Sequence, residues 1–156
     1  MKPINVGLLG IGTVGGGTWD VLARNGDEIH RRAGRAIRIS MVADKQVELA
    51  RKRVANKAKV RSDAFDVARD EGVDIVVELI GGYTVAKDLV LEAIRHGKHV
   101  VTANKALLAT HGNEIFAAAQ KKGVMVAFEA SVGGGIPIIK ALREGLAANR
   151  IEWIAG

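Results

Sequence analysis

A glycine-rich turn that follows a short apolar run constrains the fold of this chain more than any other feature. The run Ile4-Asn-Val-Gly-Leu-Leu-Gly10 is typical of a buried parallel strand, and Gly10-Ile-Gly-Thr-Val-Gly15 leads from it into a predicted helix. In that context Gly10 permits the tight turn, Gly12 lets the backbone approach a pyrophosphate, and Gly15 allows close helix–strand packing. The amide groups at the helix N-terminus favour an anion. The spacing therefore predicts a dinucleotide-binding unit.

Strand and helix patterns alternate along the residues that follow. Further strands are expected at residues 36–44, 60–61, 73–79, 98–102 and 124–128. Helices are expected at residues 13–32, 47–55, 64–71, 84–96, 104–109 and 113–122, with Asp63 and Thr84 as N-caps and Gly97 and Gly123 as stops. Repeated βαβ units predict the α/β class. We expect a doubly wound parallel sheet, which is the Rossmann-like dinucleotide-binding architecture.

The pattern changes near the C-terminus. Residues 129–137 are expected to form a glycine-rich turn, followed by a helix at 138–145 and a strand at 151–155 that begins a new region. We therefore expect a dinucleotide-binding domain at residues 1–136. Residues 137–156 are expected to be the truncated start of a substrate and dimerisation domain, which would make this chain a fragment.

Composition excludes several classes of function. The chain has no cysteine, so disulfides, thiolate metal sites and cysteine nucleophiles are excluded. The net charge is +6, with much of the excess between Lys45 and Arg61, and we favour a solvated helix face there over a nucleic-acid surface. The absence of a long apolar run and of a signal-peptide pattern predicts a cytoplasmic protein without membrane contact.

Asp44 ends the second predicted strand, where an acid usually binds the 2′-hydroxyl of the adenosine ribose. It can also cap the helix that starts after Lys45, and the two roles are compatible. Lys45, Arg51 and Lys57 leave room for a 2′-phosphate instead. The choice between NAD and NADP stays open.

Two further segments follow strands at the edge of the sheet where ligands bind. Gly81 and Gly82, after Glu78, either let the chain pass close to a nicotinamide or form an ordinary turn. The segment Thr102-Ala-Asn-Lys105 contributes Thr102 and Asn104 as candidate cofactor contacts and Lys105 as a candidate proton donor. From position alone, a surface lysine remains the more common interpretation.

Four motifs in the same order resemble homoserine dehydrogenase. They are Gly10-Ile-Gly-Thr-Val-Gly15, Glu78-Leu-Ile-Gly-Gly82, Val101-Thr-Ala-Asn-Lys-Ala-Leu-Leu-Ala109 and Phe128-Glu-Ala-Ser-Val-Gly-Gly-Gly-Ile-Pro-Ile-Ile139. That family reduces aspartate 4-semialdehyde to homoserine with NAD(P)H, on the route from aspartate to threonine and methionine. The resemblance implies a small-molecule substrate, a homo-oligomeric full-length protein, and a substrate domain with a second catalytic lysine that this chain lacks.

The resemblance also implies roles for particular residues. Lys105 becomes an active-site lysine beside the nicotinamide. The pyrophosphate loop becomes Gly10, Gly12, Thr13, Val14 and Gly15, and the ligands of a monovalent cation, Na⁺ or K⁺, become Glu129, Val132, Gly134 and Ile136. We expect the chain alone to bind cofactor without turning over substrate.

Two other interpretations of the sequence stay open. A non-catalytic dinucleotide-sensing module would use Lys105 only as a ligand contact. Aspartate-semialdehyde dehydrogenase shares the metabolite and a similar cofactor fold, but it needs a cysteine nucleophile that this chain does not have.

Overall fold

A computed structural model describes residues 2–155 and contains a six-stranded sheet in which every pair of neighbouring strands is parallel. The strands are β1 (Ile4–Leu9), β2 (Ile37–Ala43), β3 (Lys59–Arg61), β4 (Ile75–Glu78), β5 (His99–Thr102) and β6 (Val126–Ala127). Their order is β3-β2-β1-β4-β5-β6, so the chain winds outward in both directions from the boundary between β1 and β4. The predicted doubly wound parallel sheet is confirmed. In such sheets ligands bind where the direction of winding changes.

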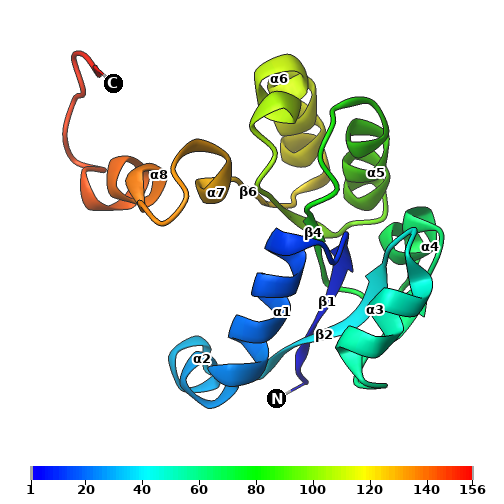
Figure 1. Cartoon of the computed structure of the whole chain (residues 1–156). Coiled ribbons are helices and arrows are strands. Elements are labelled where there is room, and N and C mark those ends of the chain that lie inside the picture. Colours follow the sequence, from blue (N-terminus) through cyan, green and yellow to red (C-terminus); the bar gives the residue numbers. More distant parts are fainter. Residues whose placement is uncertain (1, 156) are drawn as a thin grey trace.

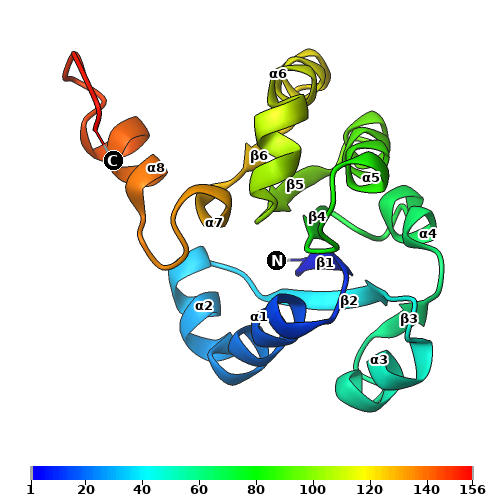
Figure 2. The same ribbon diagram turned by 45° about the horizontal axis from the view of Figure 1, so that its top comes forward.

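Helices cover both faces of the sheet (Figure 1). They are α1 (Thr13–Arg24), α2 (Gly26–Ala33), α3 (Val47–Val54), α4 (Ala64–Arg69), α5 (Thr84–Arg95), α6 (Lys105–Lys122), α7 (Glu129–Val132) and α8 (Ile138–Lys140), which continues as a π-helical turn at Ala141–Gly145. Figure 2 shows α1 and α3 on one side of the sheet and α4, α5 and α6 on the other. Residues of α8 and the turns after it project away from the sheet.

Alternation along the strands divides the core into two layers. Val6 and Leu8 of β1 belong to the cluster beneath α1 and α3, whereas the next residue, Leu9, belongs to the cluster beneath α4, α5 and α6. This alternation follows from the strand period of two. A Cβ added at Gly7 would come within 2.4 Å of the Val67 side chain, so only glycine lets α4 approach β1 this closely.

The helix predicted at residues 13–32 is two helices, and this expectation was wrong. The interruption lies at Asn25, where φ is −105° and ψ is 18°, and where the amide still donates to the Val21 carbonyl. Asn25 therefore ends α1 and starts α2, because asparagine favours helix boundaries and the following Gly26 is a weak helix former. In α2, hydrogen bonds from Arg31 and Arg32 lower the pKa of the Glu28 carboxyl.

The opposite error occurs at residues 104–122, where two predicted helices are one continuous helix, α6. Gly112 lies in the gap between the two predicted helices, yet it is buried inside α6, and an added Cβ would meet Phe116 at an ordinary 3.6 Å. Tertiary packing overrides the weak helix propensity of glycine here. Gly97 and Gly123 do end α5 and α6, each with a positive φ.

Other expectations about caps and boundaries had mixed outcomes. Asp63 caps α4 as predicted, because its Oδ1 accepts a hydrogen bond of 2.8 Å from the Phe65 amide. Thr84 is instead the first residue of α5, whose N-cap is Tyr83.

Within residues 2–155, no helix combines the length and the apolar character needed to cross a membrane.

The C-terminal region also departs from prediction. Residues 129–132 form the helical turn α7 rather than the start of an irregular turn, whereas the helix expected at 138–145 is present with a π-helical second half. The strand expected at 151–155 is absent, since no neighbouring strand pairs with these residues within the described chain. The boundary expected at residue 136 stays a prediction.

Candidate functional site

The glycine loop sits at the carboxyl end of β1, at the point where winding of the sheet changes direction. Gly10 has a φ of +89°, which a side chain would strain, and a Cβ on Gly15 would lie 2.0 Å from the Gly10 carbonyl oxygen. Gly12 is the N-cap of α1, and a Cβ there would meet no atom within 4 Å. No side chain caps this helix and no acid lies in its first turn. Its free amide groups therefore fit the pyrophosphate of a dinucleotide.

Thr13 and Val14, the other two residues predicted for the pyrophosphate loop, are the first residues of α1 and are exposed. Val14 also faces the neighbouring cleft at the ends of β4 and β5. The structure thus brings all five predicted loop residues together at one helix terminus.

Asp44 follows β2 and is attached to the glycine loop. Its Oδ2 accepts a hydrogen bond of 2.8 Å from the Ile11 amide, and its Oδ1 accepts one of 2.8 Å from the Gln46 amide. The second bond lies in the turn before α3, whose N-cap is Gln46 without a side-chain cap, so the alternative prediction that Asp44 caps this helix was wrong. Lys45 beside it is exposed. Because the carboxylate is held half-buried next to the loop, it is placed to accept further hydrogen bonds from a ribose.

A cleft of about 240 Å³ lies between the ends of β1, β4 and β5, bordered by the N-termini of α1 and α6. Its lining residues are Val14, Leu79, Gly81, Ala103, Asn104 and Lys105. Gly81 and Gly82 have φ values of +82° and +69°, and added Cβ atoms would meet nothing within 4 Å. They let the backbone turn sharply at the wall of this cleft.

A chain of hydrogen bonds connects the two walls of the cleft. Glu78 pairs in register with Thr102, and its Oε2 accepts a bond of 2.7 Å from the threonine hydroxyl. The threonine oxygen accepts a bond of 3.0 Å from the Asn104 amide. Asn104 caps α6 through the Leu107 amide at 3.1 Å, and its own side-chain amide donates to the Gly82 carbonyl at 2.5 Å.

Lys105 directly follows this network as the first residue of α6, and it is exposed at the edge of the cleft. Among the ion pairs of residues 2–155, none involves Lys105. Its ammonium group can donate to a carbonyl or alkoxide oxygen, or bind an anion.

This geometry agrees with what the sequence shares with known proteins. The family model described as homoserine dehydrogenase, NAD binding domain, matches residues 10–129, a stretch that holds the glycine loop and both walls of the cleft. The chain belongs to the homoserine dehydrogenase family. Its matched region is an NAD-binding domain, so the coarse prediction of a nicotinamide dinucleotide cofactor is confirmed.

Individual homoserine dehydrogenases are similar along the whole chain. A protein of that name from Pseudomonas aeruginosa is 61% identical over 156 residues, which is 100% of this chain and 36% of the relative. A crystal structure of a homoserine dehydrogenase from Thiobacillus denitrificans superposes with a TM-score of 0.92 at 63% identity, covering 98% of this chain and 35% of that one. A crystal structure of a homoserine dehydrogenase of S. aureus superposes with a TM-score of 0.79 at 34% identity, covering 87% of this chain and 34% of that one. The chain thus spans about a third of the length of these relatives.

The predicted cation ligands share one segment, which follows β6 and leads from α7 toward α8. Glu129 starts α7, and its two carboxylate oxygens accept hydrogen bonds from the Ile139 and Lys140 amides at 2.8 and 3.0 Å. Val132, Gly134 and Ile136 are exposed, and the Ile136 carbonyl accepts a bond from the Ile138 amide. No group of three or more His, Asp or Glu side chains forms a metal cluster in the part of the chain described.

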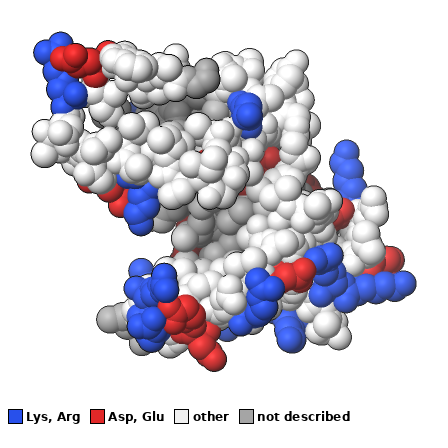
Figure 3. Space-filling model, turned by 60° about the vertical axis from the view of Figure 1, so that its left-hand side comes forward, with Lys and Arg blue, Asp and Glu red and all other residues white. Residues whose placement is uncertain are grey.

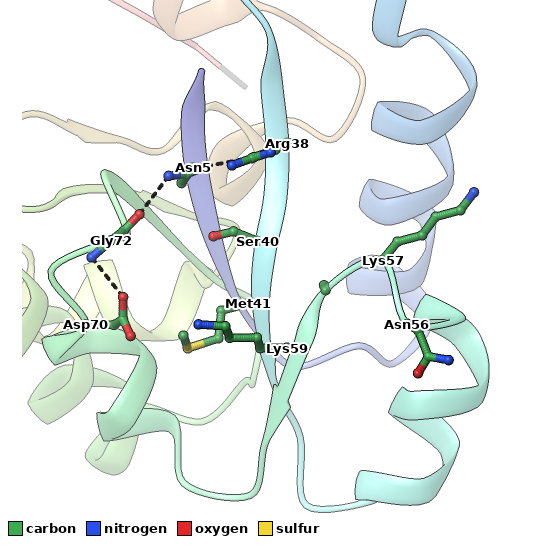
Figure 4. Close-up of a pocket in the computed structure, with 10 residues that line it drawn as sticks. Asn5, Arg38, Ser40, Met41, Asn56, Lys57, Lys59, Asp70 and Gly72 are labelled. Carbon is green, nitrogen blue, oxygen red and sulfur yellow. Dashed lines mark hydrogen bonds between the residues drawn. The ribbon is translucent and has the colours of Figure 1, made fainter. Parts of the chain in front are cut away.

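A larger hollow, of about 440 Å³, lies at the opposite edge of the sheet, where β1 and β2 begin (Figure 4). There Asn5 accepts a bond of 2.9 Å from Arg38 and donates one of 2.9 Å to the Gly72 carbonyl. Lys57, in the turn between α3 and β3, also lines this hollow. Asn5 thus connects Arg38 to Gly72, and the hollow lies at the opposite end of the strands from the glycine loop.

Of the seven basic residues between Lys45 and Arg61, three lie on α3, and the others lie in the turns beside it or on β3. Figure 3 shows Lys and Arg side chains concentrated on the lower part of the face drawn, in the region of α2 and α3, whereas the upper part is mostly uncharged. Arg51 pairs with Glu48 at 2.7 Å and Arg53 pairs with Asp20 at 2.5 Å. These pairings are typical of a solvated helix face.

Sequence reasoning missed Glu78 and Ser131 as parts of this site. Glu78 is fully buried behind the cleft, and the Ser131 hydroxyl donates to the Thr102 carbonyl at 2.7 Å. A carboxylate inside the otherwise apolar run at residues 73–79 was the available signal for Glu78. No comparable signal marks Ser131.

Proposed function

We propose that this chain supplies the cofactor-binding part of a homoserine dehydrogenase, which interconverts homoserine and aspartate 4-semialdehyde with NAD(P). The observation that carries the proposal is the cleft between the glycine loop and Lys105, in a chain of this family. When bound, the nicotinamide supplies or accepts the hydride that is exchanged with the substrate carbon. Substrate-binding groups are contributed from outside the described residues.

In this proposal the chain's own residues orient the cofactor and handle charge. Amide groups at the start of α1 bind the pyrophosphate, and Asp44 accepts hydrogen bonds from the adenosine ribose. Gly81, Gly82, Thr102 and Asn104 shape the wall against which the nicotinamide end lies. The Lys105 ammonium group donates a proton or a hydrogen bond to the substrate oxygen, which stabilises negative charge as the aldehyde is reduced.

The test is a steady-state assay of the full-length protein with NAD⁺ or NADP⁺. We expect the absorbance of reduced nicotinamide to increase when homoserine is added and not when L-serine replaces it. Tight binding of the dinucleotide without any homoserine-dependent reduction would favour the non-catalytic binding module instead.

We also propose that Glu129 and the backbone carbonyls of Val132, Gly134 and Ile136 bind Na⁺ or K⁺. A carboxylate and carbonyl oxygens are the hard ligands that such ions prefer, and all four residues lie in one short segment. The Glu129 carboxylate caps α8, so binding requires those two hydrogen bonds to be shared or exchanged. Turnover that is equal in sodium, potassium and bulky organic-cation buffers would contradict this proposal.

Finally, we infer that the full-length protein is a homo-oligomer and acts in the cytoplasm. Large apolar side chains are exposed along the C-terminal segment, including Ile136, Trp153 and Ile154. Contiguous exposed apolar groups commonly mark an interface. Sedimentation velocity of the full-length protein is expected to give a mass above that of one chain, and a monomer at all concentrations would contradict the inference.

A further inference from the structure

Glu78 is unusual among the acidic residues of this chain because its burial is not compensated by a cation. Its side chain is 0% exposed, and no ion pair of residues 2–155 includes it. Glu92, the other buried glutamate, is 6% exposed and contacts the side chains of Arg69, Arg95 and His96. Burying an unpaired carboxylate is costly, so its retention calls for a specific reason.

The donors that hold Glu78 all belong to the walls of the cleft. Its Oε1 accepts hydrogen bonds from the Ile80 amide at 2.9 Å and the Gly81 amide at 3.4 Å, both in the turn after β4. Its Oε2 accepts from the Thr102 hydroxyl at 2.7 Å, at the end of β5. One carboxylate thus joins the ends of two neighbouring strands.

The connection closes into a ring of hydrogen bonds. The Thr102 hydroxyl oxygen accepts a hydrogen bond from the Asn104 backbone amide, and the Asn104 side-chain amide donates one to the Gly82 carbonyl. Because Gly81 and Gly82 have positive φ and no side chains to pack, little else restrains their turn. The ring therefore fixes this turn relative to the first residue of α6, which is Lys105.

We propose that Glu78 is a positioning residue that holds the turn at residues 79–82 and the start of α6 in the arrangement that receives the nicotinamide end of the cofactor beside Lys105. Two of its three hydrogen-bond donors are backbone amides of this turn. This inference rests on the proposed function only for the identity of the bound dinucleotide. Glu78 touches neither substrate nor cofactor in this account.

The test compares two ligands of the full-length protein by equilibrium titration. NADH reaches both halves of the site, whereas ADP-ribose carries the adenosine and pyrophosphate without the nicotinamide. Glu78→Gln keeps the side-chain shape and removes the charge and one acceptor. We expect Kd for NADH to rise about tenfold while Kd for ADP-ribose changes by less than about twofold, the tenfold change corresponding to about 1.4 kcal/mol. If the protein binds NADPH and not NADH, then NADPH and 2′-phospho-ADP-ribose replace NADH and ADP-ribose in this comparison.

Glu92→Gln is the matched control, since it neutralises the other buried glutamate on α5, away from the cleft. It is expected to lower Tm without changing the ratio of the two Kd values. Thr102→Val removes only the hydroxyl and is expected to reproduce Glu78→Gln. The double variant should be less than additive, because both changes break one connected network. Should Glu78→Gln fail to fold, Thr102→Val carries the test.

Equal weakening of NADH and ADP-ribose, or no weakening of either, would overturn the proposal and leave Glu78 a purely structural residue. The homoserine assay is independent of this comparison. A protein that binds NADH but does not oxidise homoserine would refute the proposed function alone. A protein that oxidises homoserine but whose Kd ratio is unchanged by both substitutions would refute only the role of Glu78.

Discussion

At the scale of single residues, the position of Lys105 is unfavourable for the helix that carries it. It is the first residue of α6, where the helix dipole favours negative rather than positive charge, while Lys121 and Lys122 occupy the favourable C-terminal turn. Helix stability therefore gives no reason for a lysine at position 105. The position of Lys105 at the edge of the cleft offers a reason, since an ammonium group there can contact a ligand that enters the cleft.

Replacing Lys105 by alanine in the full-length protein should lower kcat for homoserine oxidation by about 10²–10⁴-fold, the usual contribution of a positioned acid or base. Cofactor Kd should change little, because the glycine loop and Asp44 are untouched. Lys121→Ala, at the other end of the same helix, is the control and should leave kcat unchanged. A normal kcat for Lys105→Ala would reduce this residue to a ligand contact.

Asp44 should set the preference between NAD and NADP. Its carboxylate is fixed beside the glycine loop by the Ile11 and Gln46 amides, so a 2′-phosphate would meet a like charge. In Asp44→Asn, the ratio of the Kd for NADP⁺ to the Kd for NAD⁺ should fall by about tenfold, or about 1.4 kcal/mol. Asp63→Asn is the control, because the Asp63 carboxylate also accepts a hydrogen bond from the backbone amide two residues later, but away from the glycine loop. An unchanged ratio would mean that Asp44 only holds the backbone of the glycine loop and of the turn before α3.

At the scale of elements, two glycines of α1 allow a direct comparison. A Cβ on Gly15 would lie 2.0 Å from the Gly10 carbonyl oxygen, whereas one on Gly17 would meet nothing within 4 Å. Gly15→Ala should lower the free energy of unfolding by about 1–3 kcal/mol through overpacking and weaken cofactor binding. Gly17→Ala should raise the free energy of unfolding by about 0.5–1 kcal/mol, because alanine is the better helix former. Denaturant titration measures both, and equal effects of the two substitutions would refute the close packing of α1 on β1.

Sequence patterns predicted which elements exist better than they predicted where helices begin and end. All six strands and the winding of the sheet were expected, because apolar runs alternating with helical spacing leave few other folds. The sequence did not predict that a helix ends at Asn25, or that α6 continues through Gly112. Both features depend on tertiary packing, which local helix propensity does not describe. The strand expected at residues 151–155 had β-forming residues but no pairing partner among those described.

The candidate site was predictable wherever a backbone requirement demands a particular residue. Gly10, Gly12 and Gly15 carry such requirements, and the structure meets each of them at one helix terminus. The pairing of Glu78 with Thr102 could not be read from the sequence, because it depends on strand order and register between segments 24 residues apart. Long-range register of this kind is visible only in the folded sheet.

At the scale of the whole molecule, the doubly wound topology brings separate motifs to one edge. The ends of β1, β2, β4 and β5 deliver the glycine loop, Asp44, the turn after Glu78 and Lys105, although these lie far apart along the chain. The hollow at the opposite edge is larger but lies where β1 and β2 begin, away from the glycine loop. The direction of the strands, rather than the size of a hollow, therefore identifies the binding edge.

Calorimetric titration of this chain with NADH and NADPH measures directly whether it binds a dinucleotide, because every residue assigned to the cofactor lies within it. We predict one-to-one binding of at least one of the two, weakened by Gly15→Ala and retained in Gly17→Ala. A chain that is folded by circular dichroism, yet gives no binding heat with either dinucleotide at several temperatures, would contradict the account.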